Sequence, residues 1–294
     1  MILGAIDIGS NAARLLIASV SQNKGSEVLV NELNLLRVPL RLGFDVFEKN
    51  EISREKIEMM KETMLSFQHM MKAYKVNHYK AFATSAMRDA ANSYEVINYI
   101  KDVSNIHVHV ISGEQEANLI FETHFAENLP RNNNYMYIDV GGGSTEISFF
   151  KQGKLVGGRS FNIGTIRLLK NRVAESDWSA MKSFISSFVS RKENIISIGS
   201  GGNINKVFSL SKRKEGKPLP LELLKDYYKE LECVSFEDRI NKYKLKPDRA
   251  DVIVPALSVY INAMRWGGSE EILVPKIGMA DGLIRHLWKE ISSK

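Results

Sequence analysis

Residues 5–10 read AIDIGS, and residues 137–142 read YIDVGG. In both stretches an apolar run delivers an aspartate, Asp7 or Asp139, into a turn that is rich in glycine and serine. A second apolar segment follows each turn and is typical of a returning strand. One such match carries little weight, because strand–glycine–strand is the common pattern of hairpins. Two matches, 132 residues apart, predict an internal duplication.

The duplication predicts two domains, and the clearest break between them is the polar run at residues 130–134, PRNNN. This run follows a segment with helical spacing and precedes the second apolar strand. We therefore expect residues 1–128 to form the first domain and residues 129–279 to form the second.

Helix and strand signals alternate in the first half of the chain. Ser53 is expected to cap a long helix that runs to Tyr74, because apolar residues recur there every three or four positions. The sequence SGEQ, which starts at Ser112, is a capping-box pattern and predicts a helix over residues 114–126. Residues 35–43 predict a strand that is followed by a loop.

Composition limits the classes of function that need to be considered. Of 294 residues, 44% are hydrophobic and 25% are charged, which is ordinary for a globular enzyme or binding protein. A net charge of +6 attracts anions but does not choose among nucleic acid, membrane and phosphate metabolites. The single cysteine excludes an intramolecular disulfide and a cysteine-based zinc cluster. No run of 18 apolar residues occurs and the amino-terminal stretch does not resemble a signal peptide, so a cytoplasmic location is expected.

Glycine and serine crowd three turns that follow strands. A bound phosphate needs backbone N–H donors that can approach closely, and glycine leaves such donors unhindered. Either of the first two turns, taken alone, is better explained as a tight structural hairpin. The candidate phosphate-binding residues are Ser10 and Asn11 in the first turn, Gly141, Gly142, Gly143, Ser144 and Thr145 in the second, and Gly201 and Gly202 in the third.

Carboxylates beside these turns suggest a metal ion. Asp7 and Asp139 end their strands next to the glycine turns, where a carboxylate would repel phosphate unless a cation lay between them. Mg²⁺ prefers carboxylate oxygens together with the oxygens of substrate phosphates. Glu146 lies on the returning strand and is expected to point toward the same place. A single aspartate at a strand end is usually structural, so this prediction depends on all three acids.

Two further segments hold candidate catalytic side chains. Glu114 and Glu116 lie in the first turn of the second predicted helix, where either could complement the helix dipole or act as the base that deprotonates water. Thr84 and Ser85 follow a predicted strand and supply two hydroxyls. Arg88 comes shortly after them, and its planar guanidinium suits a terminal phosphoryl group as well as a surface pair with the neighbouring aspartate.

Together these segments resemble the exopolyphosphatase / guanosine pentaphosphate phosphatase (Ppx/GppA) family, within the actin and sugar-kinase superfamily. Phosphate loops of strand and glycine occur across the superfamily, whereas the combination of TSAMRDA, SGEQE and DVGGGSTE is far more specific. The matching segments follow the family's order through nearly the whole chain: residues 7–11 (DIGSN), 84–90 (TSAMRDA), 111–121 (ISGEQEANLIF), 138–146 (IDVGGGSTE), 161–168 (FNIGTIRL), 198–203 (IGSGGN) and 249–255 (RADVIVP).

The resemblance implies an α/β fold of two ribonuclease-H-like (actin-like ATPase) domains with an interdomain cleft. It also implies a carboxyl-terminal helix, within residues 280–294, that returns to the first domain. Ala12 departs from the family, many members of which have serine there. By position, the family's roles fall on Glu116 as the base, Arg88 as the phosphate-binding arginine, and Asp139 and Glu146 as the metal-handling acids. In the mechanism that we expect, Asp7 helps to position the metal or the water.

The activity that the resemblance implies is that of an exopolyphosphatase, which hydrolyses the terminal phosphate of inorganic polyphosphate with Mg²⁺. The chain looks like a short, two-domain form, so short polyphosphates are the expected substrates, and a homodimer is expected because it is common among relatives. No nucleic acid or membrane partner is expected. The alternatives are a guanosine pentaphosphate 5′-phosphohydrolase, a non-catalytic sensor of guanosine tetra- or pentaphosphate, and an ATP-dependent phosphotransferase, for which no segment supplies an adenosine pocket.

Overall fold

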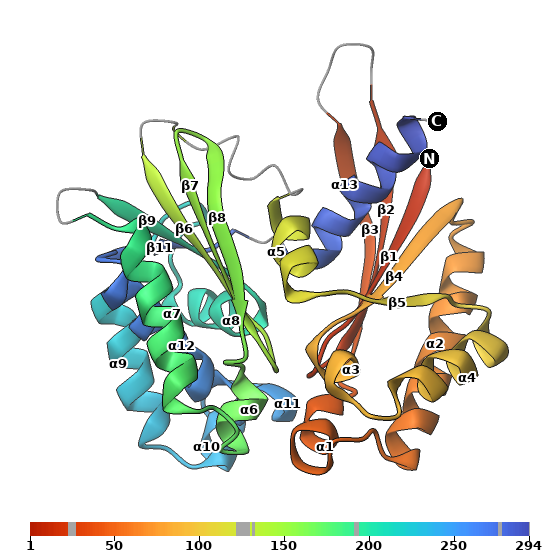
Figure 1. Ribbon diagram of the computed structural model, residues 1–294, viewed down its shortest axis with the longest axis horizontal. Coiled ribbons are helices and arrows are strands. Elements are labelled where there is room, and N and C mark those ends of the chain that lie inside the picture. The colour runs from red at the N-terminus through yellow and green to blue at the C-terminus, as the bar shows by residue number, and fades with distance from the viewer. Residues whose placement is uncertain (23–27, 122–129, 131–132, 191–193, 276–277, 294) are drawn as a thin grey trace. The chain divides into compact units, whose positions relative to one another are not determined.

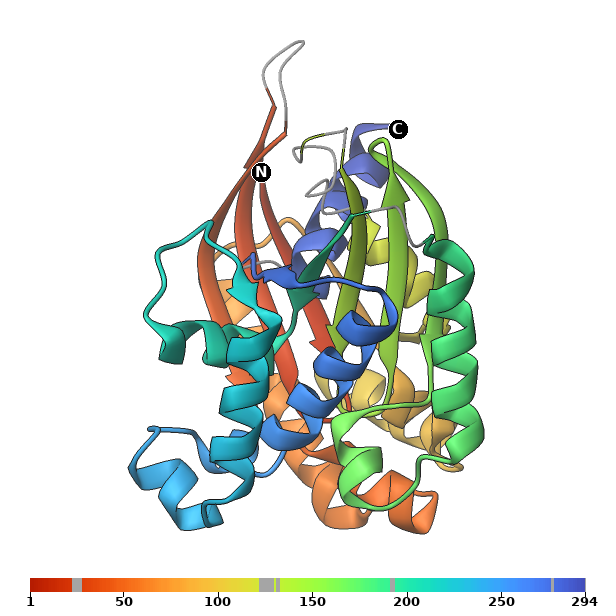
Figure 2. The same cartoon turned by 90° about the vertical axis from the view of Figure 1, so that its left-hand side faces the viewer.

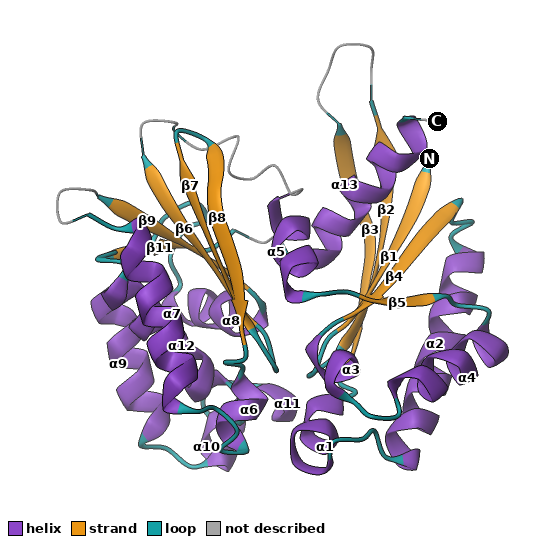
Figure 3. Ribbon diagram, viewed as in Figure 1, coloured by secondary structure: helices purple, strands orange, loops and turns teal. Residues whose placement is uncertain are grey.

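The computed structural model describes residues 1–22, 28–121, 130, 133–190, 194–275 and 278–293. The chain divides into two compact units, of which unit 1 comprises Met1–Thr123 and Gly278–Lys294 and unit 2 comprises His124–Ile277. The expected boundary between residues 128 and 129, and the end of the helix expected over residues 114–126, lie outside the described residues. Figure 3 shows helices and strands in both units, so the fold is α/β.

Unit 1 is built on a five-stranded sheet with the order β3-β2-β1-β4-β5. β1 and β2 form an antiparallel hairpin that β3 extends, whereas β4 and β5 run parallel to β1. Parallel strands end at one edge of the sheet, so the turns that follow β1, β4 and β5 meet there. The strands are β1 (Ile2–Ile8), β2 (Ala13–Ser21), β3 (Leu29–Val38), β4 (His78–Ala83) and β5 (Val108–Val110).

Helices cover both faces of this sheet. α13 packs on β1, β2 and β4 through its apolar side, whereas α2 and α4 pack together on the opposite face (Figure 1). The amino end of β1 and the carboxyl end of α13 lie at the same end of the unit (Figures 1 and 2). The helices of unit 1 are α1 (Leu42–Lys49), α2 (Arg54–Ala73), α3 (Ser85–Asp89), α4 (Ser93–Ser104), α5 (Gly113–Phe121) and α13 (Met279–Ser292).

Unit 2 repeats the same topology, which confirms the predicted duplication. Its sheet has the order β10-β11-β9-β6-β7-β8, in which β6, β7 and β8 are antiparallel and β9 and β11 run parallel to β6 and β9 respectively. The strands are β6 (Asn134–Val140), β7 (Thr145–Lys151), β8 (Lys154–Phe161), β9 (Ile195–Ser200), β10 (Leu219–Pro220) and β11 (Glu271–Leu273).

A buried helix organises the core of unit 2. α12 packs against β6 and against α7, α8 and α9, and its buried side chains include Leu257, Tyr260 and Met264. The helices of unit 2 are α6 (Thr165–Leu169), α7 (Glu175–Phe188), α8 (Gly202–Ser211), α9 (Leu221–Glu232), α10 (Phe236–Asn241), α11 (Pro247–Ala250) and α12 (Ile253–Trp266). Among the helices that the structure describes, none is both long and apolar enough to cross a bilayer.

Both predicted helix caps are confirmed. The Ser53 side chain accepts a hydrogen bond from the Lys56 N–H at the start of α2. At α5, the Ser112 N–H donates to Gln115 Oε1 over 2.8 Å, and the Gln115 N–H donates to Ser112 Oγ over 3.2 Å. This reciprocal pair is a capping box, and it fixes the turn that carries the two candidate glutamates.

The predicted strand over residues 35–43 is wrong at its carboxyl end. β3 ends at Val38, and α1 begins at Leu42 after Arg41 takes a left-handed conformation with φ of 57°. The turn is fixed because the Arg41 and Gly43 N–H groups bond to the carbonyls of the first glycine turn. The apolar side chains of α1 are buried on one face of the helix, so helical packing replaces the expected extended chain.

Candidate active site

The glycine turn of unit 2 presents its N–H groups in one direction. The turn closes with a hydrogen bond from Gly141 N to Ser144 O, 2.9 Å long. Because a trans peptide points each carbonyl away from the next N–H, the engaged carbonyls leave the N–H groups of Gly142, Gly143 and Ser144 on the opposite side. The carbonyls of Gly141, Gly142 and Gly143 accept from Thr165 N (3.0 Å), Ile166 N (2.8 Å) and Arg167 Nε (2.7 Å) respectively.

Close contact with the segment before α6 fixes the shape of this turn. A Cβ atom at Gly164 would lie 2.4 Å from the carbonyl carbon of Gly143, so only glycine fits there. Thr145 Oγ1 donates to Ile163 O over 2.5 Å. The hydroxyl of Thr145 is therefore committed to the fold, and the turn offers a phosphate its N–H groups and the Ser144 hydroxyl.

The turn after β1 has the same construction. Gly9 N donates to Ala12 O over 3.0 Å, as Gly141 does to Ser144. The carbonyls of Ser10 and Asn11 each accept from the start of α1 over 2.9 Å. By the same geometry, the N–H groups of Asn11 and Ala12 point away from α1. Both units therefore carry an amide nest at the end of the first strand.

The hydroxyls predicted for unit 1 meet at the edge of its sheet. Ser10 Oγ and Ser85 Oγ lie 2.8 Å apart, and both side chains are buried. Thr84 is also buried, and its N–H continues the β1–β4 ladder by donating to Ile8 O. Ser85 begins α3, so these hydroxyls sit between the amide nest and the helix that carries Arg88.

Arg88 and Glu116 face each other within unit 1. Arg88 Nη1 donates to the carbonyl of Ile111 over 2.7 Å and lies 3.6 Å from Glu116 Oε2. Glu116 is 8% exposed, whereas Glu114, two residues earlier on α5, is exposed. A buried carboxylate held beside a guanidinium can accept a proton from water next to a bound phosphate. The sequence also allowed Arg88 to form a surface pair with the neighbouring aspartate. The contacts with Ile111 and Glu116 explain the position of the Arg88 side chain without that pair.

Cross-strand neighbours of the two aspartates differ between the units. Asp7 lies opposite Arg14, with Arg14 Nη1 3.4 Å from Asp7 Oδ2. Asp139 occupies the equivalent place in unit 2 and lies opposite Glu146. Residues opposite each other in an antiparallel pair share a face of the sheet. Unit 1 therefore pairs its aspartate with a cation, whereas unit 2 places two acids side by side.

Polar groups surround the two acids of unit 2. Ser160 Oγ donates to Glu146 Oε1 over 2.7 Å, and Glu146 is 2% exposed. Gly201, with φ of +105°, brings its backbone so close that a Cβ atom there would lie 3.1 Å from Asp139 Oδ1. Tyr260 donates to the carbonyl of Ser200, and burial together with the nearby Asp139 raises the pKa of the Tyr260 phenol well above its usual value.

The third glycine turn serves a different purpose at each of its positions. Gly201 makes room for Asp139, whereas Gly202 makes room for Arg249, whose Nη2 would lie 2.6 Å from a Cβ atom at that position. Arg249 Nη1 donates to the carbonyl of Gly202 at the start of α8. The glycines thus allow close packing around the acids, in addition to any contact with phosphate.

The donor set of unit 2 fits a divalent cation. The buried Glu146 carboxylate and the half-buried Asp139 carboxylate beside it repel each other unless a cation or a proton lies between them. Mg²⁺ is held in such sites by one or two carboxylates, with phosphate oxygens and water completing its shell. Within the described ranges, no group of three or more Asp, Glu, His or Cys side chains gathers to form a self-sufficient metal site. Asp139 and Glu146 are the residues that would hold the ion.

Sequence reasoning missed four residues that contact the predicted ones. Strand register and tertiary packing bring each of them to a partner that lies between 7 and 60 positions away in the sequence. Arg14, which directly precedes the apolar run of the returning strand, was the one local signal available. The missed residues are Arg14, Ser160, Arg249 and Tyr260.

Solved structures share this fold. A Ppx/GppA family member from Aquifex aeolicus has 24% sequence identity and a TM-score of 0.77, with 99% of this chain and 98% of that chain covered. An exopolyphosphatase from Cytophaga hutchinsonii has 22% identity and a TM-score of 0.83, with the same coverage of both chains. These likenesses show the expected two-domain, actin-like fold.

A curated relative adds a sequence match. The bifunctional 3-dehydroquinate synthase/phosphatase of Fusobacterium nucleatum is 26% identical over 298 residues, which covers 92% of this chain and 44% of that protein. This chain thus spans less than half the length of that relative. The model of the Ppx/GppA phosphatase family matches residues 19–290. With that match across both repeated units, the chain belongs to the Ppx/GppA phosphatase family, whose members are hydrolases of phosphoanhydride bonds.

Proposed function

We propose that the protein is an exopolyphosphatase that removes the terminal phosphate of short-chain inorganic polyphosphate in an Mg²⁺-dependent reaction. The observation that carries the proposal is the amide nest that each unit has at the end of its first strand, because backbone N–H groups gathered in this way bind phosphate oxygens. The name of the Cytophaga hutchinsonii exopolyphosphatase and the family match support the same choice.

Glu116 is the proposed general base. Its carboxylate orients a water molecule and takes its proton as the water attacks the terminal phosphorus. The bond from that phosphorus to the bridging oxygen breaks, so orthophosphate is released and the bridging oxygen stays on the shortened chain. Arg88, held by the Ile111 carbonyl, stabilises negative charge on the oxygens of the transferred group. A base of this kind contributes about 10²–10⁴-fold to the rate.

The amide nests bind phosphate oxygens without carrying charge of their own. Gly142, Gly143 and Ser144 offer three N–H groups in unit 2, and Asn11 and Ala12 offer two in unit 1. Within unit 1, Ser10 and Ser85 can donate hydrogen bonds from their hydroxyl groups to the phosphate oxygens at the nest of that unit. Mg²⁺ at Asp139 and Glu146 would neutralise phosphate charge. Ser160 holds the Glu146 carboxylate in place.

A guanosine pentaphosphate 5′-phosphohydrolase is the alternative, because its substrate carries the same terminal phosphoanhydride. A non-catalytic sensor of guanosine tetra- or pentaphosphate is the second alternative. The buried Glu116 beside Arg88 favours hydrolysis over sensing, because a sensor needs no base at that position.

Phosphate release by the purified protein tests the proposal. Wild-type protein is assayed with short-chain polyphosphate and with guanosine pentaphosphate separately, with Mg²⁺ and with EDTA. The proposal expects Mg²⁺-dependent release that is faster from polyphosphate. Faster release from the nucleotide would overturn it in favour of the first alternative, and tight nucleotide binding without release would favour the sensor.

A further inference from the structure

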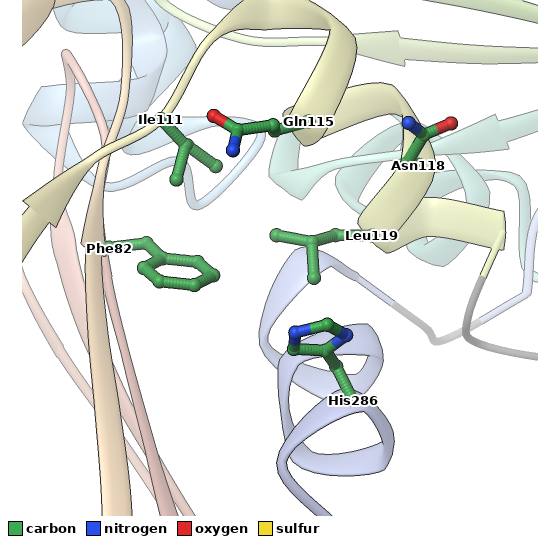
Figure 4. A pocket seen from close by; sticks show the side chains of 6 residues that line it. All are labelled: Phe82, Ile111, Gln115, Asn118, Leu119 and His286. Carbon is green, nitrogen blue, oxygen red and sulfur yellow. The ribbon is translucent and has the colours of Figure 1, made fainter. Parts of the chain in front are cut away.

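A cavity of about 250 Å³ lies within unit 1, beside the helix that carries Glu116. Figure 4 shows Phe82 and Leu119 facing each other across it, with His286 below and Ile111 above. Phe82 comes from β4, His286 from α13, and Leu119, Gln115 and Asn118 come from α5.

Two polar groups of this cavity have defined hydrogen-bonding roles. Gln115 Oε1 accepts from the Ser112 N–H, so the amide nitrogen of Gln115 is the end that turns toward the cavity (Figure 4). His286 Nε2 lies 3.1 Å from Glu290 Oε1. An imidazole that keeps its hydrogen on Nε2 for this carboxylate presents Nδ1 as an acceptor. The cavity thus offers a donor and an acceptor between aromatic and aliphatic walls.

The charge of the lining distinguishes this cavity from the glycine turns. The described lining contains no Lys, Arg, Asp or Glu, and the nearby Lys80 is 2.5 Å from Glu290, with which it forms an ion pair. A phosphate would find no amide nest here, and the Lys80 ammonium, 5.8 Å from the centroid of the Phe82 ring, is already paired with Glu290. A neutral ring would bury its faces against Phe82 and Leu119, and the polar atoms of its edge would form hydrogen bonds with Gln115 and His286.

We propose that this cavity binds a neutral, planar heteroaromatic ring of nucleobase size, and that the bound ring stiffens the first turn of α5. Gln115 connects the two effects, because it both lines the cavity and closes the capping box with Ser112. Glu116 follows directly, and its N–H donates to the carbonyl of Ser112 over 3.0 Å. A ring bonded to Gln115 therefore restrains the turn that holds Glu116.

Adenine is the probe for binding, and the methyl resonances of Ile111 and Leu119 report on it. His286→Phe keeps an aromatic ring but removes the acceptor, and losing one such hydrogen bond should weaken binding roughly three- to tenfold. Leu119→Phe fills the cavity and should abolish saturable binding. His78→Phe is the matched control, because His78 is an exposed residue of β4 outside the lining.

The proposal expects saturable shifts of both methyl groups in the wild type and in His78→Phe, together with slower hydrogen exchange of the Glu116 amide when adenine is present. Absence of saturable shifts in the wild type, or wild-type affinity in both His286→Phe and Leu119→Phe, would overturn the binding site. Unchanged exchange at Glu116 would overturn the coupling to α5. These readouts do not use phosphate release, so they remain separate from the test of the proposed activity.

Discussion

The two units repeat one backbone but carry opposite charge at the same place. Across three strands of unit 1, the register aligns Asp7, Arg14 and Arg37. Across the matching strands of unit 2, it aligns Asp139, Glu146 and Ser160. The first row sums to a charge of +1 and the second to −2 with all groups ionised.

The two copies of the fold therefore share a backbone nest that we propose binds phosphate, but they differ in the charge of the side chains beside it. Both units keep the amide nest, because it depends on backbone bonds that the hairpin and the following helix dictate. The acidic and basic side chains beside the nest differ between the units without changing its shape, because the hydrogen bonds that close each turn are made mostly by backbone groups. Unit 1 therefore suits an anion directly, whereas unit 2 suits an anion accompanied by a cation.

The largest expected effect concerns Glu116 of unit 1, the proposed base, for which no counterpart is proposed in unit 2. Glu116→Gln removes the proton acceptor while keeping the shape of the side chain, so turnover of polyphosphate should fall by about 10²–10⁴-fold. Binding of polyphosphate should persist. Steady-state phosphate release and equilibrium binding measure the two quantities.

Glu114→Gln is the control for this prediction, because Glu114 lies on the same turn of α5 but is exposed. Its turnover should stay close to that of the wild type. Equal losses in the two variants would contradict a specific role for Glu116 and would point to a general effect on the helix.

The next effect concerns stability and tests how tightly unit 2 holds its nest. Gly164→Ala forces a methyl group to within 2.4 Å of the Gly143 carbonyl carbon. Such overpacking costs typically about 1–3 kcal/mol of unfolding free energy. Chemical denaturation followed by circular dichroism measures the loss.

Gly278→Ala is the matched control, since Gly278 is also the N-cap residue of a helix but a Cβ atom there meets only Asp281 Oδ2, at 3.9 Å. Both variants replace an N-cap glycine by alanine, so the effect of this replacement on helix stability cancels in the comparison. A loss in Gly164→Ala no greater than that in Gly278→Ala would contradict the close packing of the nest.

The duplicated strands, the glycine turns and the two helix caps could be predicted from the sequence because each depends on neighbouring residues. An aspartate at a strand end, a serine at an N-cap and the SGEQ pattern are local signals. α1 was missed because its short apolar pattern also suits a strand, and Arg41 turns the chain through bonds to a distant segment.

The charge difference between the units could not be predicted in the same way. The position of Arg14 opposite Asp7 follows from hairpin register, but Ser160 reaches Glu146 only because β8 pairs with β7 in one particular register. Arg249 and Tyr260 contact residues 47 and 60 positions away. Tertiary packing sets these contacts. The roles of the predicted site residues stay predictions until variants are measured.

The smallest expected effect concerns the hydroxyl that holds Glu146. Ser160→Ala removes a single side-chain hydrogen bond, and the net contribution of such a bond is about 0.5–1.5 kcal/mol. We expect a rise in the Mg²⁺ concentration that gives half-maximal phosphate release, with little change in maximal rate. Ser148→Ala is the control, because Ser148 is a buried serine on the same face of β7 as Glu146. An equal rise in both variants would contradict a specific role for Ser160.

We propose that unit 2 holds the cation and that unit 1 does not. A measurement of metal binding in variants of each unit tests this assignment. Binding of Mn²⁺, as a spectroscopic substitute for Mg²⁺, is measured by electron paramagnetic resonance in wild type, Glu146→Gln and Arg14→Gln. We expect Glu146→Gln to weaken Mn²⁺ binding by about tenfold or more, whereas Arg14→Gln should leave Mn²⁺ binding unchanged or make it slightly tighter. Undiminished Mn²⁺ binding in Glu146→Gln would contradict the assignment of the cation to unit 2.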